Sequence, residues 1–257
     1  MCTLAVYFRV SPTFPVIVAA NRDEFLARPA AAPGVIAHDP WVVAGQDLAA
    51  GGTWLGVNEE RMVVGLLNRL NPAGPDPRRR SRGLLCLETL QTRDPAAALA
   101  HVRHQHPAHY NAFNLLVAGV DEAHVVTNDG RRITATALEP GVHVLTNLDV
   151  NDATCPRIAQ SHRLFRAVPV SSGAPPETLL PRLRAILSDH IVPLDPRGEA
   201  SAGTLCVHRG DYGTRSSSII ALAEGSGPMR YWHAAGPPCE EPYAAVALPC
   251  DASGRRS

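Results

Sequence analysis

The chain has 257 residues, of which 45% are hydrophobic and 19% charged, a composition typical of a globular protein with a substantial core. Its 24 basic residues balance 24 acidic ones, so no net positive charge favours nucleic-acid binding, and no apolar run reaches the roughly 20 residues that a membrane-spanning helix needs. Every basic residue is arginine, which excludes a P-loop lysine, a Schiff-base lysine and any other lysine-dependent chemistry.

Short apolar runs rich in valine and isoleucine predict strands along most of the chain. They lie at residues 2–10, 15–20, 54–58, 62–67, 113–118, 124–127, 141–145, 205–208, 217–222 and 230–234. Apolar residues that recur every three or four positions predict helices at 84–92, 95–105, 157–168 and 177–190. Strand groups that flank helical blocks, without repeats or a βαβ series, indicate an α+β layered fold. We expect one domain over 1–250 and a loose tail over 251–257.

The cysteines are spread along the chain without a C-x-x-C pair or a spacing typical of zinc ligands. They are Cys2, Cys86, Cys155, Cys206, Cys239 and Cys250. This pattern predicts no disulfide framework and no metal site. The first methionine is followed directly by a strand pattern, without the basic and apolar segments of a leader. We therefore expect a reduced, cytoplasmic protein.

The second residue is a candidate nucleophile. A small side chain at this position generally permits removal of the initiator methionine, which would leave Cys2 with both a thiol and a free α-amine. An α-amine with a pKa of about 7.7–8.0 can accept the thiol proton and later donate it to a leaving amine. The alternative is a small buried strand residue, since unpaired cysteine is among the most buried residue types.

Six short blocks, in order along nearly the whole chain, carry a family resemblance. They are MCTL at 1–4, NRDE at 21–24, GGTWLGVN at 51–58, YNAFNLL at 110–116, LTN at 145–147 and YGTRSSS at 212–218. Together they resemble the NRDE family, also called the transport and Golgi organisation family. This family is similar to N-terminal-nucleophile hydrolases such as choloylglycine hydrolase and penicillin acylase. The resemblance implies a four-layer αββα sandwich, which is an α+β fold.

The resemblance also implies that Cys2 is the nucleophile and that residues of the second strand orient it. Arg22 and Asp23 are the nearest counterparts of an Arg-Asn-x-Asp stretch in the relatives. Strand alternation puts Arg22 and Glu24 on one face and Asp23 on the other, which leaves open which acid points inward. A late arginine beside serines corresponds to Arg215, which would lower the pKa of the thiol or hold Asp23 in place.

Two asparagines correspond to oxyanion donors of the relatives. Asn147 stands in a Thr-Asn pair, and Asn68 ends an apolar strand in a way that resembles a Gly-Leu-Asn sequence. Loss of one such donor costs about 2.7–4 kcal/mol in a comparable site. Without the resemblance, an asparagine at a strand end is a common turn residue, and Arg22 is a surface ion-pair residue.

Other residues are expected to contact a substrate. They are Asn21, Glu24, Trp54 and Arg82. Arg82 ends the basic run 78–82, which is either an anion clamp at the mouth of a pocket or a solvated loop. No cysteine or carboxylate completes a set of metal ligands with the histidines at 101, 104, 106 and 109. We therefore expect these histidines at a solvated helix end rather than around a metal.

Three classes of function remain open. The first is a hydrolase that cuts a linear amide C–N bond through a thioester on Cys2 and needs no cofactor. The second is a non-catalytic carrier of haem or lipid, because members of the resembled family are linked to haem trafficking and lipid homeostasis. The third is a scaffolding protein, which leaves the six blocks unexplained. We expect a small-molecule partner, no nucleic acid and no stable membrane insertion, and the sequence does not define an oligomeric state.

Overall fold

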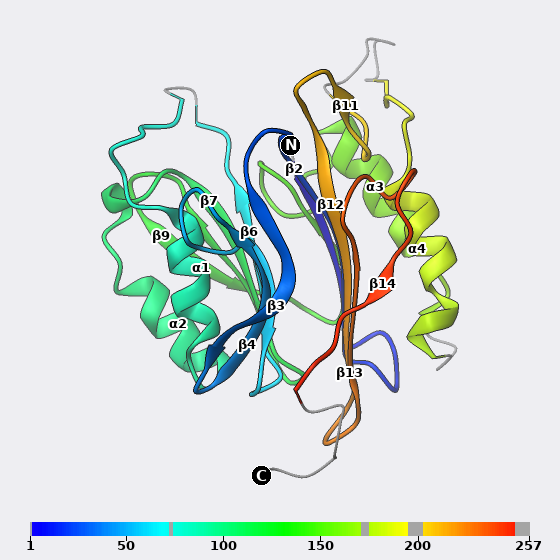
Figure 1. Ribbon diagram of the computed structural model, residues 1–257, viewed down its shortest axis with the longest axis horizontal. Helices are drawn as coiled ribbons and strands as arrows, with labels where there is room; N and C mark the ends of the chain where they lie inside the picture. The colour runs from blue at the N-terminus through cyan, green and yellow to red at the C-terminus, as the bar shows by residue number, and fades with distance from the viewer. Residues whose placement is uncertain (1, 72–73, 171–174, 195–202, 250–257) are drawn as a thin grey trace.

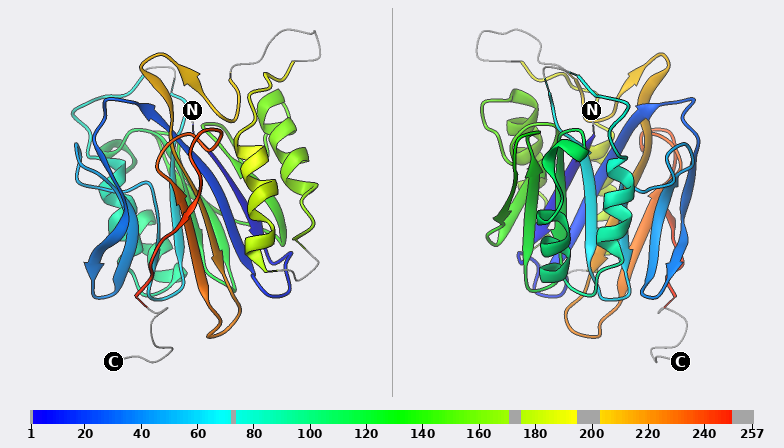
Figure 2. Two further views of the ribbon diagram at one scale, coloured as in Figure 1. Left: turned by 45° about the vertical axis from the view of Figure 1, so that its right-hand side comes forward. Right: turned by 90° about the vertical axis from the view of Figure 1, so that its left-hand side faces the viewer.

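Two antiparallel sheets lie face to face, and each carries two helices on its outer side (Figure 1). The computed structural model describes residues 2–71, 74–170, 175–194 and 203–249. Figure 2 shows the same layers from two further directions. No helix in these residues is long and apolar enough to cross a membrane.

The first sheet contains the first and the last strand in chain order, β1 and β14. Its strand order is β10-β1-β2-β12-β13-β14, and β11 pairs with β12 beside this path. The strands are β1 (Thr3–Phe8), β2 (Val16–Phe25), β10 (Gly141–Leu145), β11 (His208–Arg209), β12 (Tyr212–Leu222), β13 (Met229–Ala234) and β14 (Ala244–Ala245). β2 therefore lies at the centre of the sheet, between β1 and the long β12.

The second sheet is a meander whose strands follow one another in chain order from β3 to β9. They are β3 (Ala30–His38), β4 (Trp41–Asp47), β5 (Leu55–Asn58), β6 (Val63–Asn68), β7 (Phe113–Ala118), β8 (Ala123–Asn128) and β9 (Ile133–Ala137). Consecutive antiparallel strands need only short connections, and the helical insertion between β6 and β7 is the exception.

The helices form the two outer layers (Figure 1). α1 (Arg82–Leu90) and α2 (Pro95–Arg103) pack on the second sheet, and α3 (Pro156–Arg166) and α4 (Leu180–Leu187) pack on the first. Short 3-10 turns accompany them, among them η1 (Pro107–His109) and η3 (Pro176–Thr178). Asp94 caps the N-terminus of α2, and its carboxylate accepts a hydrogen bond of 2.7 Å from the N–H of Ala97.

Strand alternation explains why the first sheet is buried on both faces. Leu4, Val6 and Phe8 of β1 point into the core between the sheets. Ala5 and Tyr7 point instead into the layer under α3 and α4. Because successive side chains of a strand point to opposite faces, a strand with two covered faces reads as a continuous apolar run.

The four-layer αββα sandwich implied by the resemblance is confirmed. Four strands were not predicted, namely β3, β4, β9 and the two-residue β14. β3 and β9 are the two edges of their sheet and contain no fully buried residue, so their sequences lack a clear apolar pattern. The predicted strand at 205–208 is mostly irregular and enters the sheet only at its end. The predicted tail at 251–257 lies outside the described residues.

Candidate active site

Cys2 lies at the start of β1, next to the end of β2. The two strands pair with Thr3 opposite Asn21, which brings the Cys2 side chain against the main chain of Asp23. The N–H of Asp23 donates a hydrogen bond to Sγ of Cys2 (3.3 Å), and the S–H of Cys2 points to the carbonyl oxygen of Asp23 (3.6 Å). The strand register therefore fixes the thiol against the NRDE segment.

Opposing charges act on the Cys2 thiol. Burial raises its pKa above the ordinary value, and the negative charge of Asp23 raises it further. The guanidinium of Arg22 acts in the opposite direction, because a positive charge stabilises the thiolate. Since the raising effects are larger, the thiol keeps its proton at neutral pH. Nucleophilic attack by Cys2 therefore requires a base.

Asp23 is buried, and a neighbouring strand holds its carboxylate. The hydroxyl of Thr214 on β12 donates a 2.7 Å hydrogen bond to Oδ1 of Asp23. The oxygen of Thr214 in turn accepts a 2.9 Å hydrogen bond from the N–H of Val207. Burial raises the pKa of Asp23, whereas the Thr214 bond and the charge of Arg157 on α3 favour the ionised form.

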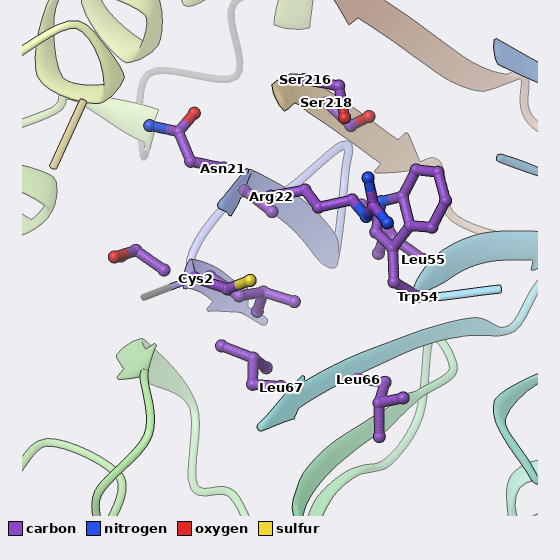
Figure 3. A pocket seen from close by; sticks show the side chains of 12 residues that line it. Cys2, Asn21, Arg22, Trp54, Leu55, Leu66, Leu67, Ser216 and Ser218 are labelled. Carbon is purple, nitrogen blue, oxygen red and sulfur yellow. The ribbon is translucent and has the colours of Figure 1, made fainter. Parts of the chain in front are cut away.

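The side chain of Arg22 stacks on a tryptophan ring (Figure 3). Its Cζ atom lies 4.1 Å from the ring centroid of Trp54, within the range of a cation–π interaction. Its Nη2 lies 4.0 Å from Oε2 of Glu24, so Arg22 and Glu24 share one face of β2, as alternation requires. Gly45 makes room for this stack, because a Cβ atom there would come within 2.6 Å of the Trp54 ring.

Two adjoining cavities open at Cys2 and share Asp23, Asn68 and Arg82. The larger has a volume of about 540 Å³ and is also lined by Asn147. The other has a volume of about 400 Å³ and contains the stack of Arg22 on Trp54 and the carboxylate of Glu24. The sequence-predicted residues thus gather around one thiol, except for Arg215. Asn21 lines a further, small cavity of about 20 Å³ together with Cys2 (Figure 3).

Asn68 and Asn147 approach the larger cavity from different sheets. Asn68 ends β6, and Asn147 follows β10. The N–H of Leu70 donates a 2.8 Å hydrogen bond to the carbonyl oxygen of Asn147, which ties the two segments together. Within the described part of the chain, neither side-chain amide has a hydrogen-bond partner. Both amides are therefore available to a bound molecule.

A third asparagine, which sequence reasoning did not single out, positions Asn147. Asn114 on β7 is buried, and its amide nitrogen donates to the carbonyl oxygens of Thr146 (3.0 Å) and Leu148 (2.6 Å) on either side of Asn147. Its side-chain oxygen accepts from Thr127 (3.1 Å) and from Arg69 (3.3 Å). The only sequence signal was its place in the block YNAFNLL.

The comparison of sequences decides the family. Residues 1–232 match the family described as Transport and Golgi organisation 2. The chain belongs to this family. A relative described as "Transport and Golgi organization protein 2 homolog" from Bos taurus is 30% identical over 256 residues, which cover 90% of this chain and 91% of the relative. The homologue from Homo sapiens is 28% identical over 255 residues, with the same coverage.

Solved structures similar to this Transport and Golgi organisation 2 chain are N-terminal-nucleophile hydrolases. Penicillin V acylase from Agrobacterium tumefaciens aligns with a TM-score of 0.56 and 13% identity over 91% of this chain and 83% of that one. The Caenorhabditis elegans orthologue of N-acylethanolamine-hydrolyzing acid amidase aligns with a TM-score of 0.57 and 12% identity over 85% and 92%. The C2A mutant of conjugated bile acid hydrolase from Clostridium perfringens aligns with a TM-score of 0.56 and 9% identity over 96% and 97%. At these identities the likeness shows a shared fold.

In this chain, the side chain of Asn21 in the NRDE motif binds the segment at the end of α4. Its amide nitrogen donates to the carbonyl oxygens of Leu187 (2.8 Å) and Leu205 (2.9 Å), and its oxygen accepts from Ser217 (2.6 Å). Figure 3 shows the side chain directed away from Trp54. The Asn21 amide is thus fully occupied by the protein, and it connects the end of α4 to the central strand.

Arg215 and Arg82 occupy different surroundings. A β-bulge between Thr214 and Ser216 displaces Arg215, which lines a small cavity of about 70 Å³ together with Arg22 and has no part in either cavity at Cys2. Thr214, rather than Arg215, contacts Asp23. Arg82 lines both cavities at Cys2 and donates a 2.8 Å hydrogen bond to the carbonyl oxygen of Ala112.

Proposed function

We propose that this chain is an amidohydrolase that cleaves a linear amide C–N bond of a small molecule, with Cys2 as an N-terminal nucleophile. The observation that supports the proposal is the common cavity of Cys2, Asn68 and Asn147, in which a thiol and two side-chain amides without partners among the described residues line one space. The fold shared with amide-cleaving acylases and amidases supports the same class of reaction.

The reaction begins with the α-amine of Cys2, once Met1 has been removed. The amine takes the proton of the thiol, and the thiolate attacks the amide carbonyl carbon. The carbonyl electrons move to oxygen, and the side-chain N–H groups of Asn68 and Asn147 donate hydrogen bonds to that oxyanion. Collapse of the intermediate breaks the C–N bond, and the leaving amine takes the proton from the α-ammonium group. A thioester on Cys2 remains.

Water completes the cycle. The α-amine removes a proton from the water, which attacks the thioester and releases a carboxylic acid and the regenerated thiol. The carboxylate of Asp23 stabilises the α-ammonium group in both half-reactions, because an adjacent negative charge favours the protonated amine. The raised pKa of the Cys2 thiol explains why this site needs such a base.

The charges of the larger cavity favour a substrate with an anionic group. Arg69, Arg82 and Arg209 line it, and among the described residues of that lining Asp23 is the only carboxylate. Arg69 is paired with Asp149 at 2.6 Å. Arg82 and Arg209 are therefore the guanidinium groups that we assign to a carboxylate or phosphate of the substrate.

Two measurements on the purified chain test this function. The intact mass should be lower than that of the full sequence by one methionine residue. A screen of small N-acyl amino acids and lactam amides should reveal hydrolysis by the unmodified chain and by the control Cys155→Ser, a half-buried cysteine before α3, but not by Cys2→Ala. A retained Met1, or cleavage that survives Cys2→Ala, contradicts the mechanism.

A haem titration of the same purified chain distinguishes a carrier from an enzyme. Addition of haem to a non-catalytic haem carrier should give a saturable, one-to-one shift of the Soret band, because axial ligation changes the spectrum of the iron. Saturable binding without Cys2-dependent turnover would replace the hydrolase proposal with the carrier function.

A further inference from the structure

Four potential metal ligands meet at the base of the β11–β12 hairpin, outside the cavities at Cys2. His190 follows α4, Cys206 and His208 flank Val207 at the start of the hairpin, and Cys239 lies in the turn after β13. Figure 1 shows β11 at the same end of the molecule as the end of α4. One ligand atom from each residue lies within 4.8 Å of all the others.

The distances within this group fit one tetrahedral ion. Sγ of Cys206 lies 3.6 Å from Sγ of Cys239 and 3.7 Å from Nε2 of His208, and that nitrogen lies 3.3 Å from Sγ of Cys239. Tetrahedral zinc with Zn–S of about 2.3 Å and Zn–N of about 2.0 Å requires S···S separations of about 3.8 Å and S···N separations of about 3.5 Å. Both cysteines are unpaired thiols in this structure.

Both histidines are oriented as metal ligands usually are. Nδ1 of His190 lies 3.2 Å from the carbonyl oxygen of Cys206, so its N–H can donate there and leave Nε2 as the ligand atom. Nδ1 of His208 faces Oε1 of Glu240 at 3.9 Å, while Nε2 faces the two sulfurs. A metal-bound histidine commonly uses its second nitrogen in this way, toward a backbone carbonyl or a carboxylate.

We propose that His190, Cys206, His208 and Cys239 form a structural zinc site. Two thiolates and two neutral imidazoles give a Cys₂His₂ set, which suits Zn²⁺, and the two thiolate charges balance the ion. Binding releases one proton from each thiol to solvent. Because four protein ligands fill the tetrahedron, no position remains for water or substrate, and the ion has a structural rather than a catalytic role.

The site connects three segments that hydrogen bonds already hold together, among them the bond from the N–H of Cys206 to the carbonyl oxygen of Asp189 (2.9 Å). It joins the end of α4 and the turn after β13 to the hairpin whose residues Arg209 and Tyr212 line the larger cavity. Val207, between two of the ligands, donates the hydrogen bond to Thr214 that in turn supports the carboxylate of Asp23. Zinc would therefore stabilise the wall of the cavity without contacting a substrate.

The metal content of the full chain tests this proposal without any assay of activity. Protein purified without chelator should contain one zinc ion per chain by elemental analysis. Cys239→Ser and His208→Gln should each lower zinc affinity by more than about tenfold, because even loss of an outer hydrogen bond to a ligand costs 10–100-fold. The matched controls Cys155→Ser and His109→Gln, both remote from the site, should keep the full zinc content.

Substitution of Co²⁺ for zinc in the unmodified chain tests the site even if the variants fold poorly. After removal of zinc from the unmodified chain, added Co²⁺ should give the ligand-field absorption of a tetrahedral site and a thiolate charge-transfer band, and both should disappear when zinc is returned. Zinc that stays bound in Cys239→Ser, or Co²⁺ bound without thiolate absorption, overturns the proposal. So does a Cys206–Cys239 disulfide found by peptide mapping of protein alkylated under argon.

Discussion

The main chain of Asp23 holds the sulfur of Cys2, with the N–H of Asp23 donating at 3.3 Å and its carbonyl oxygen 3.6 Å away. The same residue also acts through its side chain, because its negative charge raises the pKa of the Cys2 thiol. Asp23 therefore positions the thiol and, together with burial, keeps it protonated. The two effects are separable, since replacement of the carboxylate leaves the main chain in place.

Asp23→Asn should accelerate alkylation of Cys2 near neutral pH by up to about tenfold, because removal of the nearby negative charge lowers the pKa of the thiol and increases the thiolate fraction. The amide is isosteric, and its oxygen can still accept the hydrogen bond from Thr214. Under the proposed function, hydrolysis should fall in the same variant, since the α-ammonium group loses its stabilising charge. Peptide mapping after limiting iodoacetamide measures the alkylation rate.

The matched control is Glu24→Gln, which removes a charge from the next residue. Glu24 faces Arg22 and Arg28 at 4.0 and 3.8 Å and is not among the main influences on the pKa of Cys2. Its alkylation rate should stay within about twofold of the unmodified chain. Equal acceleration in both variants, or slower alkylation in Asp23→Asn, would show that Asp23 does not control the thiol.

Asn114→Ala should lower the free energy of unfolding by about 2–4 kcal/mol, because it removes four hydrogen bonds that are buried or partly buried. Denaturant unfolding measures this loss. Asn68→Ala is the control, since the exposed Asn68 side chain has no hydrogen-bond partner within the described residues, and it should cost less than about 0.5 kcal/mol. A small effect at Asn114 would mean that the segment around Asn147 is held by other contacts.

Asn147→Ala should leave stability almost unchanged and lower kcat by about 10²–10³-fold, because an oxyanion hydrogen bond matters mainly in the transition state. We expect little loss of stability because the side-chain amide of Asn147 has no hydrogen-bond partner in the described part of the chain. Unfolding midpoints and steady-state kinetics on a hydrolysed substrate measure the two effects. Strong destabilisation with normal kcat in the folded fraction would assign Asn147 to a turn and remove it from the oxyanion site.

Residues close in sequence were easier to place than residues brought together by topology. The NRDE motif predicted that Arg22 and Glu24 share one face of a strand, and their 4.0 Å separation agrees with that expectation. The fold followed from six blocks that span nearly the whole chain. Edge strands such as β3 escaped prediction, because one of their faces is not buried and their sequence carries no alternation.

Site details that depend on local irregularities or distant segments had no sequence signal. A bulge in β12 puts Thr214, rather than Arg215, beside Asp23, and no residue pattern marks that bulge. The ligands of the proposed zinc site come from three separate segments, so their spacing resembles no short metal motif and the sequence predicted no metal site. Asn114 acts through carbonyl groups of a loop whose path cannot be derived from composition.

The last prediction concerns the acid stability of the fold, through His233 on β13. His233 is buried, with 8% of its surface exposed, and its Nδ1 lies 2.9 Å from the hydroxyl oxygen of Ser218. Burial lowers the pKa of His233 from 6.5 to about 4. The unfolded chain therefore binds a proton before the folded chain does, and unfolding is favoured as the pH falls.

The stability that neutral His233 contributes should be fully present above pH 6.5 and should be lost as the pH falls toward about 4. At about 1.4 kcal/mol per pKa unit, the loss amounts to about 3 kcal/mol. His233→Asn keeps a polar group near the Nδ1 position but cannot be protonated, so its free energy of unfolding should decline less over the same range. The difference between the two proteins isolates His233, because every other titrating group, Asp23 included, is common to both. Parallel decline of the two stability curves, measured by urea unfolding at a series of pH values, would show that protonation of His233 does not drive the acid transition.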